Sequence, residues 1–175
     1  MRSTDSAVSA DSAVVRGDGE LAPAVRDALG RVVPAVPAAV LVPRLPAPGP
    51  LADLTDALLT SEVTDVLDSV LTDVRTVLDG VGRLVFVLPH DPLMGAPGAT
   101  AASAVANGVL SMARTLAIEL ARDAITVNVV AVDAAAPAVA ALAGQLAVLT
   151  GDAGDAVTGQ EIYLTAGTDL GRLRP

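Results

Sequence analysis

The clearest hydrophobic pattern in the chain lies between residues 97 and 133, where a helical period gives way to a strand. Apolar residues recur there every three or four positions and predict one buried stripe on a long helix: Val105, Val109, Met112, Leu116 and Leu120. The following run, residues 125–132 (ITVNVVAV), is β-branched and almost entirely apolar. Such a run is typical of a parallel strand that is covered on both faces.

A second long helical pattern runs from Leu51 to Leu78, with Ser61 as a candidate break and Gly80 after its end. Its apolar residues form two adjacent columns, more than one contact with a sheet requires. We therefore expect this helix and the helix over 98–122 to contact another subunit, through an outward column that includes Val70, Val74 and Leu110. The alternative is a helix that is simply well buried within one subunit.

The remaining patterns complete an α/β fold. Strands are predicted over residues 12–15, 38–42, 82–88 and 157–167, and helices over residues 21–29 and 138–149. We expect residues 12–167 to form a single Rossmann-like, three-layer domain with a mostly parallel sheet, between a flexible tail at 1–11 and a C-terminal tail at 168–175.

Composition restricts the chemistry more sharply than any motif. The chain has no lysine and no cysteine, one histidine (His90) and one tyrosine (Tyr163). With a single histidine and no cysteine, no metal site is predicted. A formal charge of −9 argues against nucleic acid and anionic membranes as partners. No uninterrupted apolar run reaches the ~18 residues of a membrane-spanning helix, so a cytoplasmic location is expected.

The first strand leads through Gly17 and Gly19 into a helix, which is the opening of a nucleotide-binding βα unit. Two glycines are a weak signal, and the carboxylates of Asp18 and Glu20 would repel phosphates at this turn. We interpret the glycines as a tight turn and expect no cofactor in this chain.

Four segments together resemble the short-chain dehydrogenase/reductase family. They are residues 82–88 (GRLVFVL), 115–121 (TLAIELA), 125–128 (ITVN) and 157–167 (VTGQEIYLTAG). The resemblance is specific from Arg83 to Gly167 and weak before it. It implies a Rossmann-like oxidoreductase fold in which the two long helices join a four-helix bundle between subunits.

The family's catalytic tetrad of Asn, Ser, Tyr and Lys falls on Ser61, Pro89, Ala102 and Ala106. The family's proton relay needs a tyrosine whose pKa is lowered by a neighbouring ammonium group. A chain without lysine cannot supply that group at any position. By resemblance, the sheet is also shortened at its front edge, because 31–36 replaces two strand–helix units, and the substrate lid after Val132 is missing.

His90 is the only candidate general base, with Asp91 or Asp133 as its helper. A lone histidine in a loop is typical of solvated surface, so no catalytic role is assigned to it. Three functions remain open. The first is a degenerate, non-catalytic subunit, a pseudoenzyme in a hetero-oligomer with an active dehydrogenase or ketoreductase that binds NAD(P); carrier-protein thioesters of secondary metabolite biosynthesis are the substrate class that the resemblance suggests. The others are a stand-alone lyase or isomerase using His90, and a homo-oligomeric scaffold or ligand-binding module.

Overall fold

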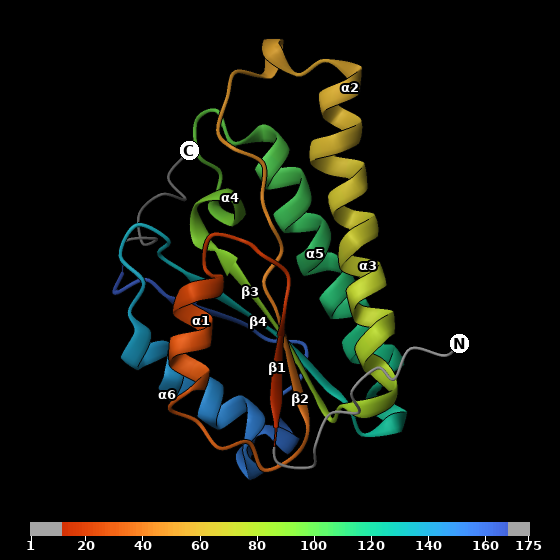
Figure 1. Ribbon diagram of the computed structural model, residues 1–175, viewed down its shortest axis with the longest axis vertical. Helices are drawn as coiled ribbons and strands as arrows, with labels where there is room; N and C mark the ends of the chain where they lie inside the picture. The colour runs from red at the N-terminus through yellow and green to blue at the C-terminus, as the bar shows by residue number, and fades with distance from the viewer. Residues whose placement is uncertain (1–11, 168–175) are drawn as a thin grey trace, which may run out of the picture.

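A five-stranded parallel sheet separates two layers of helices in the computed structural model, which describes residues 12–167 (Figure 1). The strands are β1 (Ala13–Arg16), β2 (Ala38–Leu41), β3 (Arg83–Pro89), β4 (Thr126–Val132) and β5 (Glu161–Leu164). The helices are α1 (Ala22–Leu29), α2 (Asp56–Leu59), α3 (Asp65–Val77), α4 (His90–Met94), α5 (Thr100–Glu119) and α6 (Val139–Thr150). The predicted fold class, a Rossmann-like α/β fold, is therefore confirmed, and the two predicted tails lie outside the described residues.

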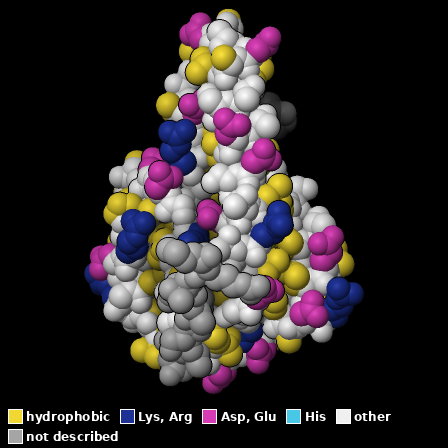
Figure 2. Space-filling model, turned by 45° about the vertical axis from the view of Figure 1, so that its right-hand side comes forward, with side chains coloured by type: hydrophobic (Ala, Val, Ile, Leu, Met, Phe, Trp, Pro, Cys, Tyr) yellow, Lys and Arg dark blue, Asp and Glu magenta, His cyan; other side chains and the backbone are white. Residues whose placement is uncertain are grey.

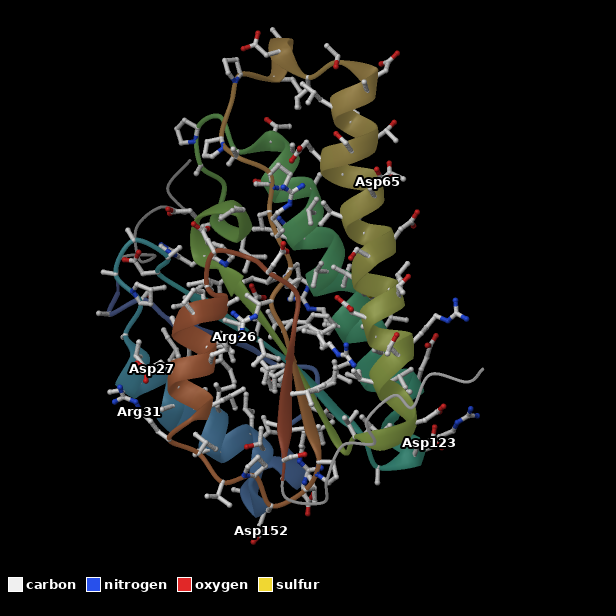
Figure 3. The ribbon with its side chains drawn as sticks, viewed as in Figure 1. Arg26, Asp27, Arg31, Asp65, Asp123 and Asp152 are labelled. Atoms are coloured by element: carbon white, nitrogen blue, oxygen red, sulfur yellow. The ribbon has the colours of Figure 1, made fainter. Side chains whose placement is uncertain are left out.

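Alternating strand residues pack into two separate hydrophobic cores, one on each face of the sheet. Val40, Val85 and Val130 face the layer formed by α1 and α6. Leu41, Phe86 and Val129 face the layer formed by α3 and α5. Every residue of β2, β3 and β4 is buried, as expected for parallel strands with helices on both faces. On the outer face of α1, charged side chains point away from this core, and Arg31 pairs with Asp27 at 3.0 Å (Figure 3).

Strand order follows chain order, β1-β2-β3-β4-β5, so every connection steps in the same direction across the sheet. The connections through α1 and α6 cross one face, whereas those through α3 and α5 cross the other. Connections that step the same way over opposite faces have opposite hands. Two of the four crossovers are therefore left-handed, a sense that parallel βαβ units adopt only rarely.

The two shortenings inferred from the resemblance have structural counterparts. Residues 30–37 join α1 directly to β2 without an intervening strand, which leaves β1 at the edge of the described sheet. Residues 133–138 alone connect β4 to α6, so no lid segment follows β4. The first difference lies at the edge of the sheet beside β1, and the second lies at the carboxyl end of β4. Related folds bind their ligands in these regions.

The long helix begins later than the periodicity indicated. Leu51–Asp53 forms a separate 3₁₀ turn, and the side chain of Thr55 caps α2 by accepting a hydrogen bond from the Leu58 amide. A π-helical turn at Thr60–Thr64 then joins α2 to α3, and it contains Ser61, where a break was predicted. The helix ends in a 3₁₀ turn at Leu78–Gly80, in agreement with the predicted stop.

The predicted outward column on the long helices is wrong. Val70, Val74 and Leu110 are only 4%, 2% and 6% exposed, and all three pack into the core between the sheet and its helices. The valines of α3 face the sheet, which turns the second column outward and leaves Leu71 46% exposed. On this side of the molecule, exposed apolar side chains lie among carboxylates and a few arginines (Figure 2).

Helix α5 has the length and the mean hydropathy of a membrane-spanning segment, which a count of uninterrupted apolar residues did not indicate. It buries Val105, Val109 and Ala113 against β3, β4 and α3. This packing identifies α5 as the core helix of the α3/α5 layer.

Candidate functional site

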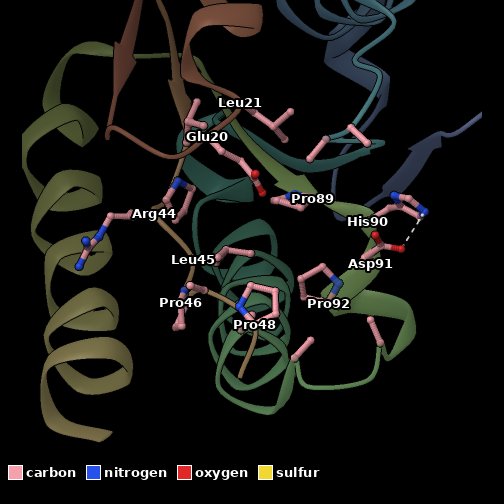
Figure 4. A pocket seen from close by; sticks show the side chains of 18 of the residues that line it. Glu20, Leu21, Arg44, Leu45, Pro46, Pro48, Pro89, His90, Asp91 and Pro92 are labelled. Atoms are coloured by element: carbon pink, nitrogen blue, oxygen red, sulfur yellow. Dashed lines mark ion pairs between the residues drawn. The ribbon is translucent and has the colours of Figure 1, made fainter. Parts of the chain in front are cut away.

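A cavity of about 550 Å³ lies at the carboxyl edge of the sheet. Its walls come from the turn after β1, the segment Val42–Pro48 after β2, the residues Pro89–Pro92 after β3 and the residues that follow β4 (Figure 4). The beginning of α5 supplies the remaining wall through Ala99 and Ala102. Parallel α/β sheets place their ligands at this edge, so the cavity is the candidate functional site.

The turn between β1 and α1 is closed against the chain that follows β2. Gly17 has a φ of +86°, and a β-carbon there would overlap the carbonyl oxygen of Val42. The amide of Gly19 donates to that same oxygen at 3.0 Å, and the amide of Ala22 donates to the Gly19 carbonyl oxygen at 2.8 Å. Pro23, in the first turn of α1, has no amide to offer. These glycines therefore make a tight turn, as predicted, and three of the positions that could bind a phosphate have no free N–H.

The structure brings together only part of the predicted tetrad. Pro89 and Ala102 both line the large cavity. Ala106, one turn further along α5, is fully buried in the core of the molecule. Ser61 lines a smaller neighbouring cavity of about 190 Å³, with Pro43 and Arg44 shared between the two. Ser61 lies in the π-helical turn at Thr60–Thr64, and turns of this kind often mark functional positions. Ser61 stands at the tetrad's asparagine position, but a serine side chain has no amide group.

The expectation that His90 is a solvated loop residue is wrong. His90 is the first residue of α4 and is 2% exposed, because the buried strand β3 leads directly into it. Neither ring nitrogen makes a hydrogen bond within the described part of the chain, although Nε2 lies 3.4 Å from Asp91 Oδ1. The continuous apolar run before His90, with Pro92 just beyond it, was the signal for this burial.

Charged groups are placed asymmetrically around the cavity. The carboxylate end of Glu20 points toward Pro89 (Figure 4). The side chain of Arg44 extends away from the cavity toward the π-helical turn before α3, where its guanidinium lies 4.0 Å from the Glu62 carboxylate. Sequence reasoning missed the segment 43–48 as a cavity wall, because its prolines only indicated a stiff connection.

The tyrosine of the chain lies outside this site. Tyr163 is on β5, and its hydroxyl donates to Glu161 Oε1 at 2.5 Å. The other carboxylate oxygen of Glu161 accepts a hydrogen bond from Arg114 on α5 at 2.9 Å. Tyr163 therefore takes part in a polar link between β5 and α5. Within residues 12–167, no three His, Asp or Glu side chains are grouped closely enough to hold a metal ion.

Comparisons with known proteins agree at the level of the fold. No protein-family model matches the chain, and no curated protein sequence matches it. An oxidoreductase of the short-chain dehydrogenase/reductase family from Burkholderia thailandensis is 25% identical, with a TM-score of 0.63, over 82% of this chain and 68% of that one. The NADH complex of a 3-ketoacyl-(acyl-carrier-protein) reductase from Brucella melitensis is 16% identical, with a TM-score of 0.62, over 75% of this chain and 67% of that one. An acetoin dehydrogenase from Enterobacter cloacae is 20% identical, with a TM-score of 0.58, over 78% of this chain and 67% of that one.

The matching region is thus about two thirds of each of these structures. The described residues provide the parallel sheet and both helical layers, with the front edge and the region after β4 shortened. This chain therefore has a truncated, Rossmann-like fold of the short-chain dehydrogenase/reductase type.

Proposed function

We propose that this chain is a non-catalytic subunit, a pseudoenzyme that assembles with an active NAD(P)-dependent dehydrogenase or ketoreductase. The observation that carries the proposal is the lining of the cavity. At the edge of the sheet where the resembled family performs its chemistry, Pro89 and Ala102 stand at two tetrad positions. Neither side chain can donate or accept a proton.

The rest of the chain does not replace the missing groups. No lysine is present anywhere, and the phenol of Tyr163 is engaged with Glu161. The turn that would hold a pyrophosphate is closed by Val42. In this proposal the partner subunit therefore supplies both the cofactor NAD(P) and the catalytic tetrad.

The outer face of α3 and α5 is the proposed contact surface, since the resembled family assembles through the corresponding helices. Leu71 on α3 is 46% exposed and Ile118 on α5 is 80% exposed, so each would gain from burial against another subunit. This assignment replaces Val70, Val74 and Leu110, which are occupied in holding α3 and α5 to the sheet.

The substrate class is proposed from the same resemblance. One structural neighbour is a reductase of ketoacyl groups bound to acyl carrier protein, crystallised with NADH. We propose carrier-protein thioesters of a secondary-metabolite pathway as substrates of the complex, with this chain completing the helical layer of its partner.

The test is co-expression of the chain with dehydrogenases encoded by neighbouring genes, followed by affinity purification and native mass measurement. We expect a stable hetero-oligomer that Leu71→Asp and Ile118→Asp disrupt. Val148→Asp is the matched control, because Val148 is 45% exposed on α6, in the opposite layer. Recovery of the chain as a monomer with every such dehydrogenase, or equal assembly of all three variants, would rule out the proposal. A homo-oligomer would favour the scaffold function instead.

A stand-alone lyase or isomerase is the second candidate, and the burial of His90 at the cavity favours it. Its weakness is orientation, because the imidazole is turned toward Asp91 rather than toward Glu20 (Figure 4). A turnover that the purified chain performs alone, and that His90→Gln abolishes without a change in melting temperature, would establish it.

A further inference from the structure

The large cavity has the size and the lining of a small-molecule site, although the proposed function assigns no ligand to it. Its volume of about 550 Å³ falls in the range of roughly 300–1,000 Å³ that ligand pockets occupy. Most of its walls are apolar, formed by proline, alanine and leucine side chains from five separate segments. Prolines also fix the backbone of these walls, so the cavity is formed before any ligand arrives.

The same prolines bias the hydrogen bonding of the cavity. Six of the nineteen lining residues are prolines, and a proline contributes a carbonyl acceptor but no N–H donor. Phosphate and carboxylate ligands need N–H donors, which Gly19, Ala22 and Pro23 at the adjoining turn do not provide. The prolines and the closed turn therefore reduce the number of N–H donors that the wall offers to an anion.

The charged groups of the cavity wall also favour a cationic ligand. The exposed Glu20 side chain lines the cavity with its carboxylate, which makes no ion pair among the described residues. The one arginine in the wall, Arg44, directs its guanidinium outward to Glu62. On the opposite wall the charge is again negative, from Asp91 beside His90. An anionic ligand would meet repulsion here, whereas a cation would be attracted.

We propose that this cavity binds a small apolar amine, with its ammonium group beside the Glu20 carboxylate and its hydrocarbon part against the proline walls. An ammonium group carries three N–H donors and no acceptor, which matches both the charge and the hydrogen-bond bias of the site. The edge that binds dinucleotide phosphates in related folds has thus become a site for cations. This inference does not depend on the proposed function, because it concerns a site within one chain.

The test uses three probes of one shape, namely cyclohexylamine, cyclohexanol and cyclohexanecarboxylate, titrated at neutral pH and low salt with ¹⁵N-labelled protein. The amine is expected to bind most tightly and the carboxylate least, with amide shifts confined to residues 19–22, 44–47 and 90–102. Glu20→Gln should weaken amine binding about fivefold, as for a partly exposed ion pair, and leave cyclohexanol binding unchanged. Asp18→Asn is the matched control, because it removes the same charge from the same turn but lines only the smaller cavity.

A second variant tests the cavity itself. Ala102→Leu places three more carbon atoms in the cavity and should weaken all three probes together. If that variant does not fold, the comparison of Glu20→Gln with Asp18→Asn still decides the matter. Equal binding of amine and carboxylate, an equal loss in the two carboxylate variants, or no saturable binding up to the solubility of the probes would overturn the proposal.

Discussion

The amide of Gly19 donates a hydrogen bond of 3.0 Å to the carbonyl oxygen of Val42, and this contact fixes the turn after β1 against the chain leaving β2. The same oxygen leaves no room for a β-carbon on Gly17. The glycines of this turn therefore serve the contact between two segments of the protein. In a dinucleotide-binding fold, the equivalent absence of side chains serves the contact with a pyrophosphate.

Substitution of Gly17 tests this contact. Gly17→Ala should lower the free energy of unfolding by more than about 1 kcal/mol, since φ is +86° and the methyl group meets a backbone oxygen. Gly144→Ala is the control, because Gly144 lies in α6 with no atom within 4 Å of an added β-carbon. There we expect a gain of about 0.5–1 kcal/mol. Urea unfolding measures both, and equal effects would contradict the role given to Gly17.

Titration with NAD⁺, NADH, NADP⁺ and NADPH should give no saturable binding to the isolated chain. The reason is geometric as well as electrostatic, because the amides of Gly19 and Ala22 already have carbonyl partners. We therefore expect the double variant Asp18→Asn/Glu20→Gln to remain without binding after the repulsive charges are gone. Calorimetry is the measurement. Micromolar binding by the double variant would assign the effect to charge alone, and micromolar binding by the wild type would refute the expectation.

Restoring the two tetrad residues on α5 should not create a reductase. Ala106 is fully buried, so Ala106→Lys places an ammonium group in the core and should cost several kcal/mol of folding free energy. Ala102→Tyr faces the cavity and should be tolerated better. Thermal melting of both single variants and the double variant, together with a carbonyl-reduction assay using NADPH, gives the answer. Turnover by the double variant is the result that would contradict this reasoning.

The two apolar columns of α3 should respond differently to charge. Val74→Asp places a carboxylate in the core, where Val74 is 2% exposed, and should destabilise the fold by about 3–5 kcal/mol. Leu71→Asp lies on the outer column, where 46% exposure should limit the loss to about 1 kcal/mol. Urea unfolding of the isolated chain separates them. A larger loss for Leu71→Asp would show that the outer column is already buried by another copy of the chain.

The fold followed from the sequence where hydrophobic periodicity was strong. The runs that became β3 and β4 are apolar at nearly every position, and such runs are typical of parallel strands buried on both faces. On α3 the valine column and the leucine column have the same helical spacing, so the sequence alone did not distinguish them. Contact with the sheet decided the outcome, and the valines occupied the inner side.

The site was less predictable, because its walls are loops brought together by distant elements. Periodicity does not describe the segment 43–48, whose prolines specify stiffness but not position. The burial of His90 likewise depends on the packing of α4 at the end of β3. By contrast, the absence of lysine required no structure at all, and it remains the strongest chemical constraint on function.

The left-handed step from β1 through α1 to β2 marks the place where this fold can be extended. Residues 30–37 carry that step, and no described strand pairs with the outer side of β1. A strand–helix unit grafted into this loop would reach the vacant side of β1 by stepping in the other direction. The crossover through α1 would then acquire the common right-handed sense, while the contacts of α1 with α6 and the sheet stayed in place. In the described part of the chain, the outer side of β1 is thus an open sheet edge at which a further strand–helix unit could pair.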